Sequence, residues 1–219
     1  SKEKGYLRKH SIKNIIQHSK TIEQFYNRQD EYDSYIEWFK TLPLYYETDD
    51  FRAVHACWDD KNIECLKKYL VDQKLNDTLI DKANEKGTEL NESIEETLKG
   101  KEIKLPHEVY FYDKENIKRG EVRIRWWEEP TSQTYRSISL EPSKTLPNEN
   151  IDTKVLKSTD YYRADEKNIF FGHYWLRGKP SLFKKNICCL DYSVARGGKL
   201  MAYRYSGEKI LDNKKFVYK

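Results

Sequence analysis

The fold is decided by the stretch from Ile169 to Tyr205, which contains IFFGHYW at residues 169–175, NICCLD at 186–191 and GGKLMAYRY at 197–205. Short apolar runs bounded by glycine are typical of buried strands, and two adjacent glycines permit a tight turn because glycine tolerates positive φ. His173 follows the first run, at the place where open α/β sheets hold ligands and catalytic groups. The stretch therefore predicts three strands joined by a histidine-bearing loop and a glycine turn, at Ile169–Phe171, Ile187–Leu190 and Lys199–Tyr205.

A second histidine has a similar setting. His55 lies near the end of FRAVHA at residues 51–56, which alternates as a strand and follows a strand at 44–46 and an acidic turn. Imidazole is a suitable ligand for Mn, Fe, Zn and Ni, so His55 and His173 are candidate metal ligands. The structural alternative is a core histidine whose two ring nitrogens are both hydrogen-bonded. The remaining histidines have no such setting and are interpreted as surface or structural residues: His10, His18 and His107.

The motifs around the two candidate ligands resemble those of a known family. Phe-Gly-His at 171–173, Leu-Asp at 190–191 and Gly-Gly-Lys-Leu-x-Ala-Tyr-Arg at 197–204 are similar to the C-terminal end of calcineurin-like metallophosphoesterases, as is Val-His-Ala at 54–56. The resemblance is greatest to the bacterial branch that groups diadenosine-tetraphosphatase-like enzymes with Ser/Thr protein phosphatases. It implies an α/β (α+β) fold, namely the C-terminal part of a four-layer α-β-β-α sandwich. The resemblance is loose from Gln73 to Asp165.

The same resemblance implies that a phosphoester is hydrolysed with two divalent metal ions, Mn first among them, with Fe, Zn, Ni or Mg as alternatives. In the family, the metals polarise the phosphate and lower the pKa of a bridging water, which attacks phosphorus in line. His55 and His173 would bind one metal, and Asp191, which follows a buried strand, would orient the imidazoles. Arg125 and Arg163 are candidate phosphate ligands because guanidinium groups bind phosphate in a bidentate way. The structural alternative for both arginines is a solvated face or a carboxylate pair.

Two departures from the family affect what this chain can do by itself. Trp175 stands where many relatives carry a second histidine, which fits the protein-phosphatase-like branch and disfavours a nuclease of the Gly-His-x-His type. The upstream signatures Asp-x-His, Gly-Asp-x-x-Asp-Arg-Gly and Gly-Asn-His-Glu do not occur in the sequence. We therefore expect residues 1–219 to be one metallophosphoesterase domain that lacks its N-terminal metal-binding half. The intact protein would be an enzyme whose general acid lies upstream, and the 219-residue chain would be nearly inactive alone.

The expected partners are the N-terminal half of the same protein and a phosphorylated substrate, either a phosphoprotein, a dinucleoside polyphosphate or a nucleic-acid end. A rival interpretation is a non-catalytic binding or scaffold module that keeps the fold with half of the site. A third interpretation is a nucleotide-binding regulator. Because the first residue is Ser1 and not methionine, the chain is expected to be a fragment, a processed product or the ordered part of a longer protein.

The rest of the sequence predicts helices and a further pair of strands. Apolar residues at helical spacing predict helices at 11–26, 30–41, 60–71, 76–85 and 88–98. We expect the first two to pack on the sheet, and the last two, which are highly charged, to lie outside the core. Residues 109–112, 113–116 and 120–127 predict a strand, a turn and a second strand.

The region before the histidine-bearing loop is interrupted by prolines. Residues 130–165 contain three prolines and little periodicity, which predicts a long loop that is either an active-site lid or a mobile insertion. We expect the whole of 73–165 to be an insertion or cap that shapes substrate access.

Composition excludes several classes of protein. The net charge of +4, from 40 basic and 36 acidic residues, is too balanced to indicate a nucleic-acid surface. The mean hydropathy is −0.95, but an aromatic content of 14% argues for a folded domain. No apolar run approaches the ~20 residues of a membrane span, and no signal peptide is evident. Four cysteines without a CxxC pair fit reduced thiols of a cytoplasmic protein: Cys57, Cys65, Cys188 and Cys189.

Overall fold

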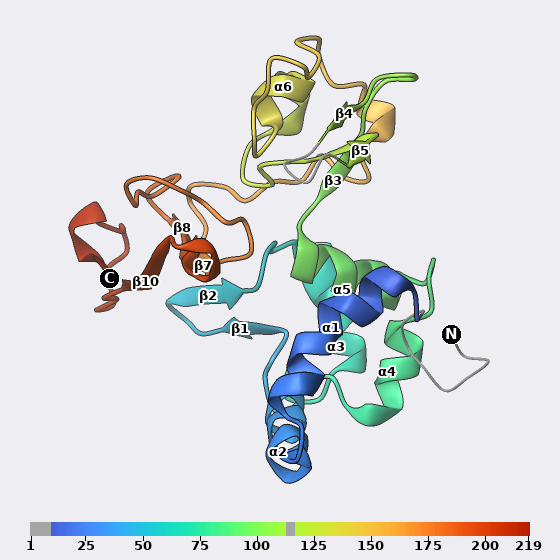
Figure 1. Cartoon of the computed structure of the whole chain (residues 1–219). Helices are drawn as coiled ribbons and strands as arrows, with labels where there is room; N and C mark the ends of the chain where they lie inside the picture. The colour runs from blue at the N-terminus through green and yellow to red at the C-terminus, as the bar shows by residue number, and fades with distance from the viewer. Residues whose placement is uncertain (1–9, 113–116) are drawn as a thin grey trace.

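The computed structural model describes residues 10–112 and 117–219. Its centre is a four-stranded sheet with the strand order β1-β2-β7-β8 (Figure 1). Strand β1 (Tyr45–Glu47) is antiparallel to β2 (Phe51–Val54), whereas β2, β7 (Asn168–Phe171) and β8 (Ile187–Cys189) are parallel to one another. The architecture is therefore mixed α and β, and the predicted N-terminal hairpin and both predicted buried strands are confirmed.

A smaller sheet packs on one face of the central sheet. It contains β9 (Asp191–Tyr192), β10 (Lys199–Tyr203) and β11 (Phe216–Tyr218) in the order β11-β10-β9. Side chains alternate across a strand, so Phe170 of β7 faces β10, with its ring centroid 5.4 Å from that of Tyr203. The predicted third strand is thus confirmed, in a sheet separate from the first two. Single turns of 3-10 helix precede β10 and β11, at Val194–Arg196 and Asn213–Lys215.

Three helices complete the main hydrophobic core on the other face. They are α3 (Asp60–Tyr69), α4 (Asp77–Ala83) and α5 (Glu89–Lys99), and each begins after a side-chain N-cap. Helix α5 buries Leu90, Ser93, Ile94 and Thr97, and Leu79, Ala83, Leu90 and Ile94 share one cluster with Ile169 and Ile187 of the sheet. The expectation that the charged helices α4 and α5 lie outside the core is therefore wrong. Small polar side chains extend the narrow apolar stripe of α5 enough to bury one whole face of the helix.

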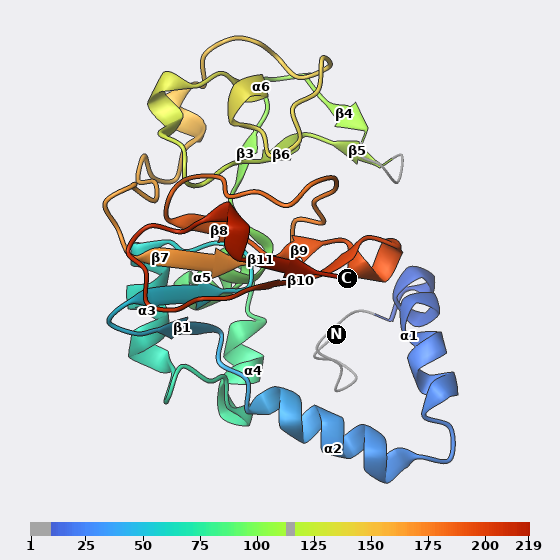
Figure 2. The same cartoon turned by 90° about the vertical axis from the view of Figure 1, so that its left-hand side faces the viewer.

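The elements that carry a second hydrophobic cluster lie above the central sheet in Figures 1 and 2. Its framework is β3 (Glu102–Lys104), β6 (Glu121–Arg123), the short helix α6 (Tyr135–Ile138) and two turns of 3-10 helix at Pro130–Ser132 and Thr153–Val155. Its buried residues are Ile103, Leu105, Val122, Ile124, Tyr135, Ile138, Leu146 and Ile151. Residues 130–165 are thus not a structureless loop, because several of their apolar side chains are buried in this cluster and Tyr162 is buried in the main core.

The prediction that residues 109–112 pair with residues 120–127 in a hairpin is also wrong. Strand β4 (Phe111–Tyr112) pairs with β5 (Lys118–Arg119), while β6 pairs with β3, with Val122 opposite Ile103. The predicted turn at 113–116 lies outside the described residues. The strand predicted to reach residue 127 ends at 123, because Trp126 and Trp127 are buried in the main core instead.

Helices α1 (Ile12–Gln24) and α2 (Gln29–Lys40) extend away from the sheets in Figure 2 and bury none of their own residues. Ile12 is 78% exposed and Trp38 is 54% exposed. Both helices were predicted, but the expectation that they pack on the sheet is wrong. In residues 10–112 and 117–219, no helix combines the length and the apolar character needed to cross a lipid bilayer.

Candidate metal centre

Two histidines meet at the carboxyl ends of adjacent parallel strands. His55 directly follows β2, and His173 follows β7 by two residues. The Gly172 N–H donates to the His55 carbonyl oxygen over 2.9 Å, so the strand pairing continues past the strand ends. The two imidazole centroids lie 5.1 Å apart, with an angle of 60° between the ring planes. The structure therefore brings together the two residues that the sequence predicts as metal ligands.

The backbone around His173 is unusual. His173 has φ +73° and Trp175 has φ +50°, left-handed values that residues other than glycine rarely adopt. The Tyr174 N–H donates to the Gly172 carbonyl over 3.0 Å, and the Trp175 N–H donates to Oδ2 of Asp191 over 3.2 Å. Such conformations persist only where surrounding contacts fix them, and they are common at functional sites.

Asp191 occupies the matching position on the third parallel strand. It follows β8 by two residues, as His173 follows β7, and its Oδ1 accepts the Ser193 N–H over 3.0 Å. Its negative charge acts on both imidazoles and raises the pKa of each, against larger opposing effects. Asp191 thus accepts hydrogen bonds from the backbone amides of Trp175 and Ser193. It therefore connects the loop that bears His173 to the loop after β9. That it also orients the imidazoles stays a prediction.

Both imidazoles are held in the neutral form. Burial lowers the pKa of His55. Burial lowers the pKa of His173 to about 4, helped by the positive charge of Arg123 and by the repulsion that would arise if His55 and His173 were both protonated. Metals bind the neutral imidazole, since its lone pair is then available. The electrostatic environment therefore favours the form that could act as a ligand.

The metal-free chain is expected to lose stability as the pH falls from about 6.5 towards 4. In this window the unfolded His173 takes up a proton whereas the folded one, with its pKa of about 4, does not, so protonation favours the unfolded state. His173→Gln should flatten this part of the curve of unfolding free energy against pH, measured with urea. The exposed control His107→Gln should leave the curve unchanged. An NMR titration that gives His173 an ordinary pKa would contradict the prediction.

The two arginines predicted as phosphate ligands lie elsewhere. The Arg163 carbonyl accepts from the Asn186 side chain over 2.8 Å, which places Arg163 at the amino end of β8, opposite the histidines. The Arg163 guanidinium pairs with Asp165 at 3.1 Å on the surface. The Arg125 guanidinium binds the carbonyl of Ser137, inside the second cluster. Neither arginine is brought to the histidine pair.

Arg123 is the arginine whose charge acts on His173. It ends β6 and pairs with Glu102 of β3 at 3.1 Å. Arg123 and Arg125 have the same parity on the predicted strand at 120–127, so alternation alone could not separate them. The distinction arises because the chain leaves β6 after residue 123.

A buried hydrogen-bond network connects the carboxyl end of β2, which bears His55, to the main core. Trp126 Nε1 donates to the Ala56 carbonyl over 3.1 Å, and the Tyr174 hydroxyl donates to the same oxygen over 3.0 Å. The amides of Ala56 and Cys57 both donate to the Thr97 carbonyl of α5, over 3.0 and 3.2 Å. The neighbours of His55 and His173 are thus fixed by buried residues, two of which lie in the predicted insertion at 73–165. No local sequence pattern marks Trp126 for this contact.

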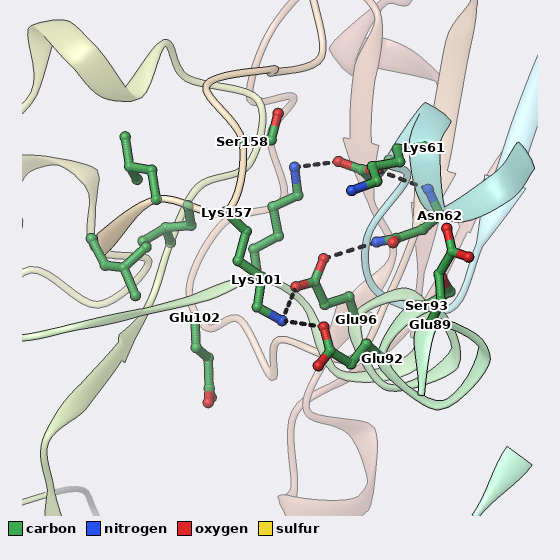
Figure 3. A pocket seen from close by; sticks show the side chains of 14 residues that line it. Lys61, Asn62, Glu89, Glu92, Ser93, Glu96, Lys101, Glu102, Lys157 and Ser158 are labelled. Atoms are coloured by element: carbon green, nitrogen blue, oxygen red, sulfur yellow. Dashed lines mark hydrogen bonds and ion pairs between the residues drawn. The ribbon is translucent and has the colours of Figure 1, made fainter. Parts of the chain in front are cut away.

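The cavity drawn in Figure 3 is a different place, between α5 and the second cluster, with a volume of about 90 Å³. Several of its charges are paired: Lys157 contacts Glu92 at 3.2 Å and Glu96 at 3.0 Å, and Lys101 forms a buried ion pair with Asp59. Burial opposes ionisation of Asp59, but the charge and hydrogen bonds of Lys101 outweigh burial and lower the pKa of Asp59. Because these carboxylates are committed to ion pairs, we interpret this cavity as structural.

The histidine pair is not part of a larger ligand set within residues 10–112 and 117–219, where no three His, Cys, Asp or Glu side chains are grouped to hold a metal ion together. Comparison with known proteins gives no further assignment: no family model, no curated protein and no solved structure matches the chain. The family suggested by the motifs therefore stays a prediction.

Proposed function

We propose that this protein is a metal-dependent phosphoester hydrolase in which His55 and His173 are ligands of one of two divalent metal ions, Mn first among them. The observation that carries the proposal is the placement of two neutral imidazoles, with centroids 5.1 Å apart, at the ends of adjacent parallel strands. A binding or catalytic site at this edge is what open α/β sheets commonly provide.

The donor chemistry fits a divalent transition metal. Imidazole nitrogens suit Mn, Fe, Zn or Ni, and lowered pKa values keep both rings deprotonated and able to coordinate at neutral pH. When bound, the pair of metals would polarise the phosphoryl group and lower the pKa of the attacking water. The proposal assigns the remaining ligands and the general acid to the N-terminal half of the same protein.

The other residues near the site have supporting roles in the proposal. Arg123 takes the place of Arg125 and Arg163 as the candidate phosphate ligand, because its charge reaches His173. Trp126 and Tyr174, both buried, exclude water from behind the imidazoles. Asp191 holds the two loops at a fixed spacing through its hydrogen bonds to Trp175 and Ser193.

The proposal also includes the finer expectations drawn from the motifs. These are a four-layer sandwich completed by the N-terminal half, a cytoplasmic location, and a phosphoprotein, a dinucleoside polyphosphate or a nucleic-acid end as substrate. The helices, central sheet and smaller sheet described above would supply three of the four layers.

A second candidate function is a non-catalytic binding or scaffold module with the same fold. The observation in its favour is the lack of a third ligand beside the histidine pair among the described residues. The upstream reading frame separates the two candidates. If it encodes the three missing signatures, the intact protein is an enzyme, and if it does not, the scaffold function is favoured.

Metal binding by the chain itself tests the proposed ligands. Mn²⁺ added to the isotopically labelled chain should broaden NMR signals first around residues 54–56 and 172–175, because paramagnetic relaxation falls steeply with distance. The double variant His55→Gln/His173→Gln should lose this broadening. The matched control His18→Gln/His107→Gln removes two exposed histidines and should keep it. Broadening at the same residues in the His55/His173 variant would exclude the two histidines as ligands.

A further inference from the structure

We propose that the pocket between the loop at 176–178 and the turn at 193–199 is a binding site for a phosphate-type dianion, separate from the histidine pair. The pocket has a volume of about 280 Å³. Its lining residues are Arg177, Gly178, Tyr192, Ser193, Arg196, Gly197, Gly198 and Lys199.

Charge is the first argument for an anionic ligand. Three of the eight lining residues are cations and none is acidic. The pocket also lies in the most basic part of the chain, since residues 174–219 contain eleven Lys and Arg but only three acidic residues. The whole chain has a net charge of only +4, so the preceding residues carry a net negative charge. The C-terminal segment that contains all eight lining residues therefore carries a net positive charge, whereas the rest of the chain does not.

Two of the three cations, Lys199 and Arg196, are held in place by defined contacts. Lys199 Nζ donates to the Gly178 carbonyl over 2.6 Å, which fixes the ammonium between the two loops. An ammonium has three donors, so this single bond leaves others for a ligand. The Arg196 guanidinium carbon lies 4.4 Å from the centroid of the Trp175 ring, an arrangement that restrains the guanidinium plane.

The turn that carries Arg196 and Lys199 is held by close backbone contacts. Ser193 and Gly197 have φ +61° and +73°, and the N–H groups of Arg196 and Gly198 both donate to the Ser193 carbonyl, over 2.8 and 2.9 Å. A Cβ atom built on Gly198 would lie 1.9 Å from the Tyr192 carbonyl oxygen, so only glycine permits this close approach of backbone to backbone. Because these amides are used within the turn, side-chain cations would have to bind the anion.

The ligand class follows from the number and kind of cations. Guanidinium groups match the oxygens of phosphate in a bidentate way, and lysine adds a compact charge. Three positive charges around one small pocket exceed what a single carboxylate needs and suit a dianion. A small pocket of about 280 Å³ also differs from the extended basic groove that tracks a nucleic-acid backbone.

The pocket adjoins the histidine pair but does not depend on it. Asp191 accepts from Trp175 of the histidine loop and from Ser193 of the pocket, so one carboxylate connects the two places. None of the eight lining residues is a proposed metal ligand. Anion binding here can therefore succeed or fail independently of the proposed function.

The test is a titration of the metal-free chain, at constant ionic strength, with inorganic phosphate and separately with tripolyphosphate. Amide NMR shifts should move at Gly178, Ser193 and residues 197–199 in a saturable way. The variants Arg177→Gln/Lys199→Gln and Arg177→Gln/Arg196→Gln should each raise the dissociation constant at least ~10-fold, because charge-assisted hydrogen bonds are lost. Using both variants guards against a local rearrangement caused by loss of the Lys199–Gly178 bond.

The matched control Lys179→Gln/Lys214→Gln removes the same charge from two exposed residues that do not line the pocket and should change the constant less than twofold. His55→Gln/His173→Gln should also bind the anion normally, which separates this test from that of the metal site. Tighter binding of tripolyphosphate than of phosphate would show that the ligand carries linked phosphates, and equal binding would indicate a single phosphate group. Absence of saturable shifts at the pocket, or an equal loss in the lysine control, would overturn the proposal.

Discussion

Replacing His173 by alanine is expected to abolish phosphoester hydrolysis, with a loss greater than ~100-fold, in protein that also contains the upstream ligands. Loss of an outer-shell partner of a metal ligand typically costs about 10–100-fold in affinity or activity, so loss of the ligand itself should cost more. His55→Ala should have a similar effect, because the two imidazoles lie at equivalent strand ends with centroids 5.1 Å apart. Turnover of p-nitrophenyl phosphate with added Mn²⁺, together with the bound Mn content, measures both effects.

The control for this experiment is His107→Ala, which removes an exposed histidine and should leave activity and Mn content unchanged. The wild-type 219-residue chain, assayed alone, should show almost no turnover, since two imidazoles are only part of a two-metal ligand set. Near-normal activity and Mn content in either the His55 or the His173 variant would remove that residue from the site. Robust turnover by the 219-residue chain would contradict the assignment of the general acid and the remaining ligands to the upstream half.

Replacing Trp126 by alanine is expected to reduce the free energy of unfolding by about 3–5 kcal/mol, the usual range for truncation of a buried tryptophan. Trp126 is 2% exposed, and its ring centroid lies 5.1 Å from that of Phe171. The substitution would also remove the hydrogen bond from Trp126 Nε1 to the Ala56 carbonyl, beside His55. Urea unfolding followed by circular dichroism gives the free-energy difference.

The matched control is Trp38→Ala, which removes the same side chain from a site that is 54% exposed. A surface substitution of this kind should change the stability by no more than about 0.5 kcal/mol. If the two substitutions reduce the free energy of unfolding equally, Trp126 does not anchor the second hydrophobic cluster, carried by residues 102–156, to the main core. A large effect of the Trp38 substitution would show that α2 has a partner in solution.

Short-range pattern was sufficient to predict the central strands and the positions of both histidines. Ile169–Phe171 and Ile187–Leu190 are apolar on both faces because the sheet is covered on both faces, by α3 to α5 on one side and by β10 on the other. A strand that is buried on both faces is a continuous apolar run, and such a run can be recognised from the sequence alone. The positions of His55 and His173 just after strands followed from the same runs.

The placement of the arginines could not be obtained in this way. Arg123 and Arg125 belong to one alternating segment, and their separation depends on where the chain leaves β6 to bury two tryptophans in a distant core. The same holds for residues 130–165, whose buried side chains show no periodicity because a cluster of short turns supplies them one at a time. The periodicity of apolar residues reveals helices and strands. It does not reveal side chains that are buried in irregular turns.

By itself, the sequence determined the five N-terminal helices, the buried central strands and the two histidines that follow strand ends, because each of these features depends on residues close together in the chain. The parallel pairing of the strands came from the structure. Only the tertiary structure decided that α4 and α5 belong to the core, that α1 and α2 stay exposed, and that Asp191 joins the histidine loop to a basic pocket. These features depend on which surfaces meet, and that choice is made by the burial of side chains far apart in the chain. The charge of Arg123 acts on His173 for the same reason: β6 pairs with β3, β3 follows α5, and the Thr97 carbonyl of α5 accepts the amides that follow His55.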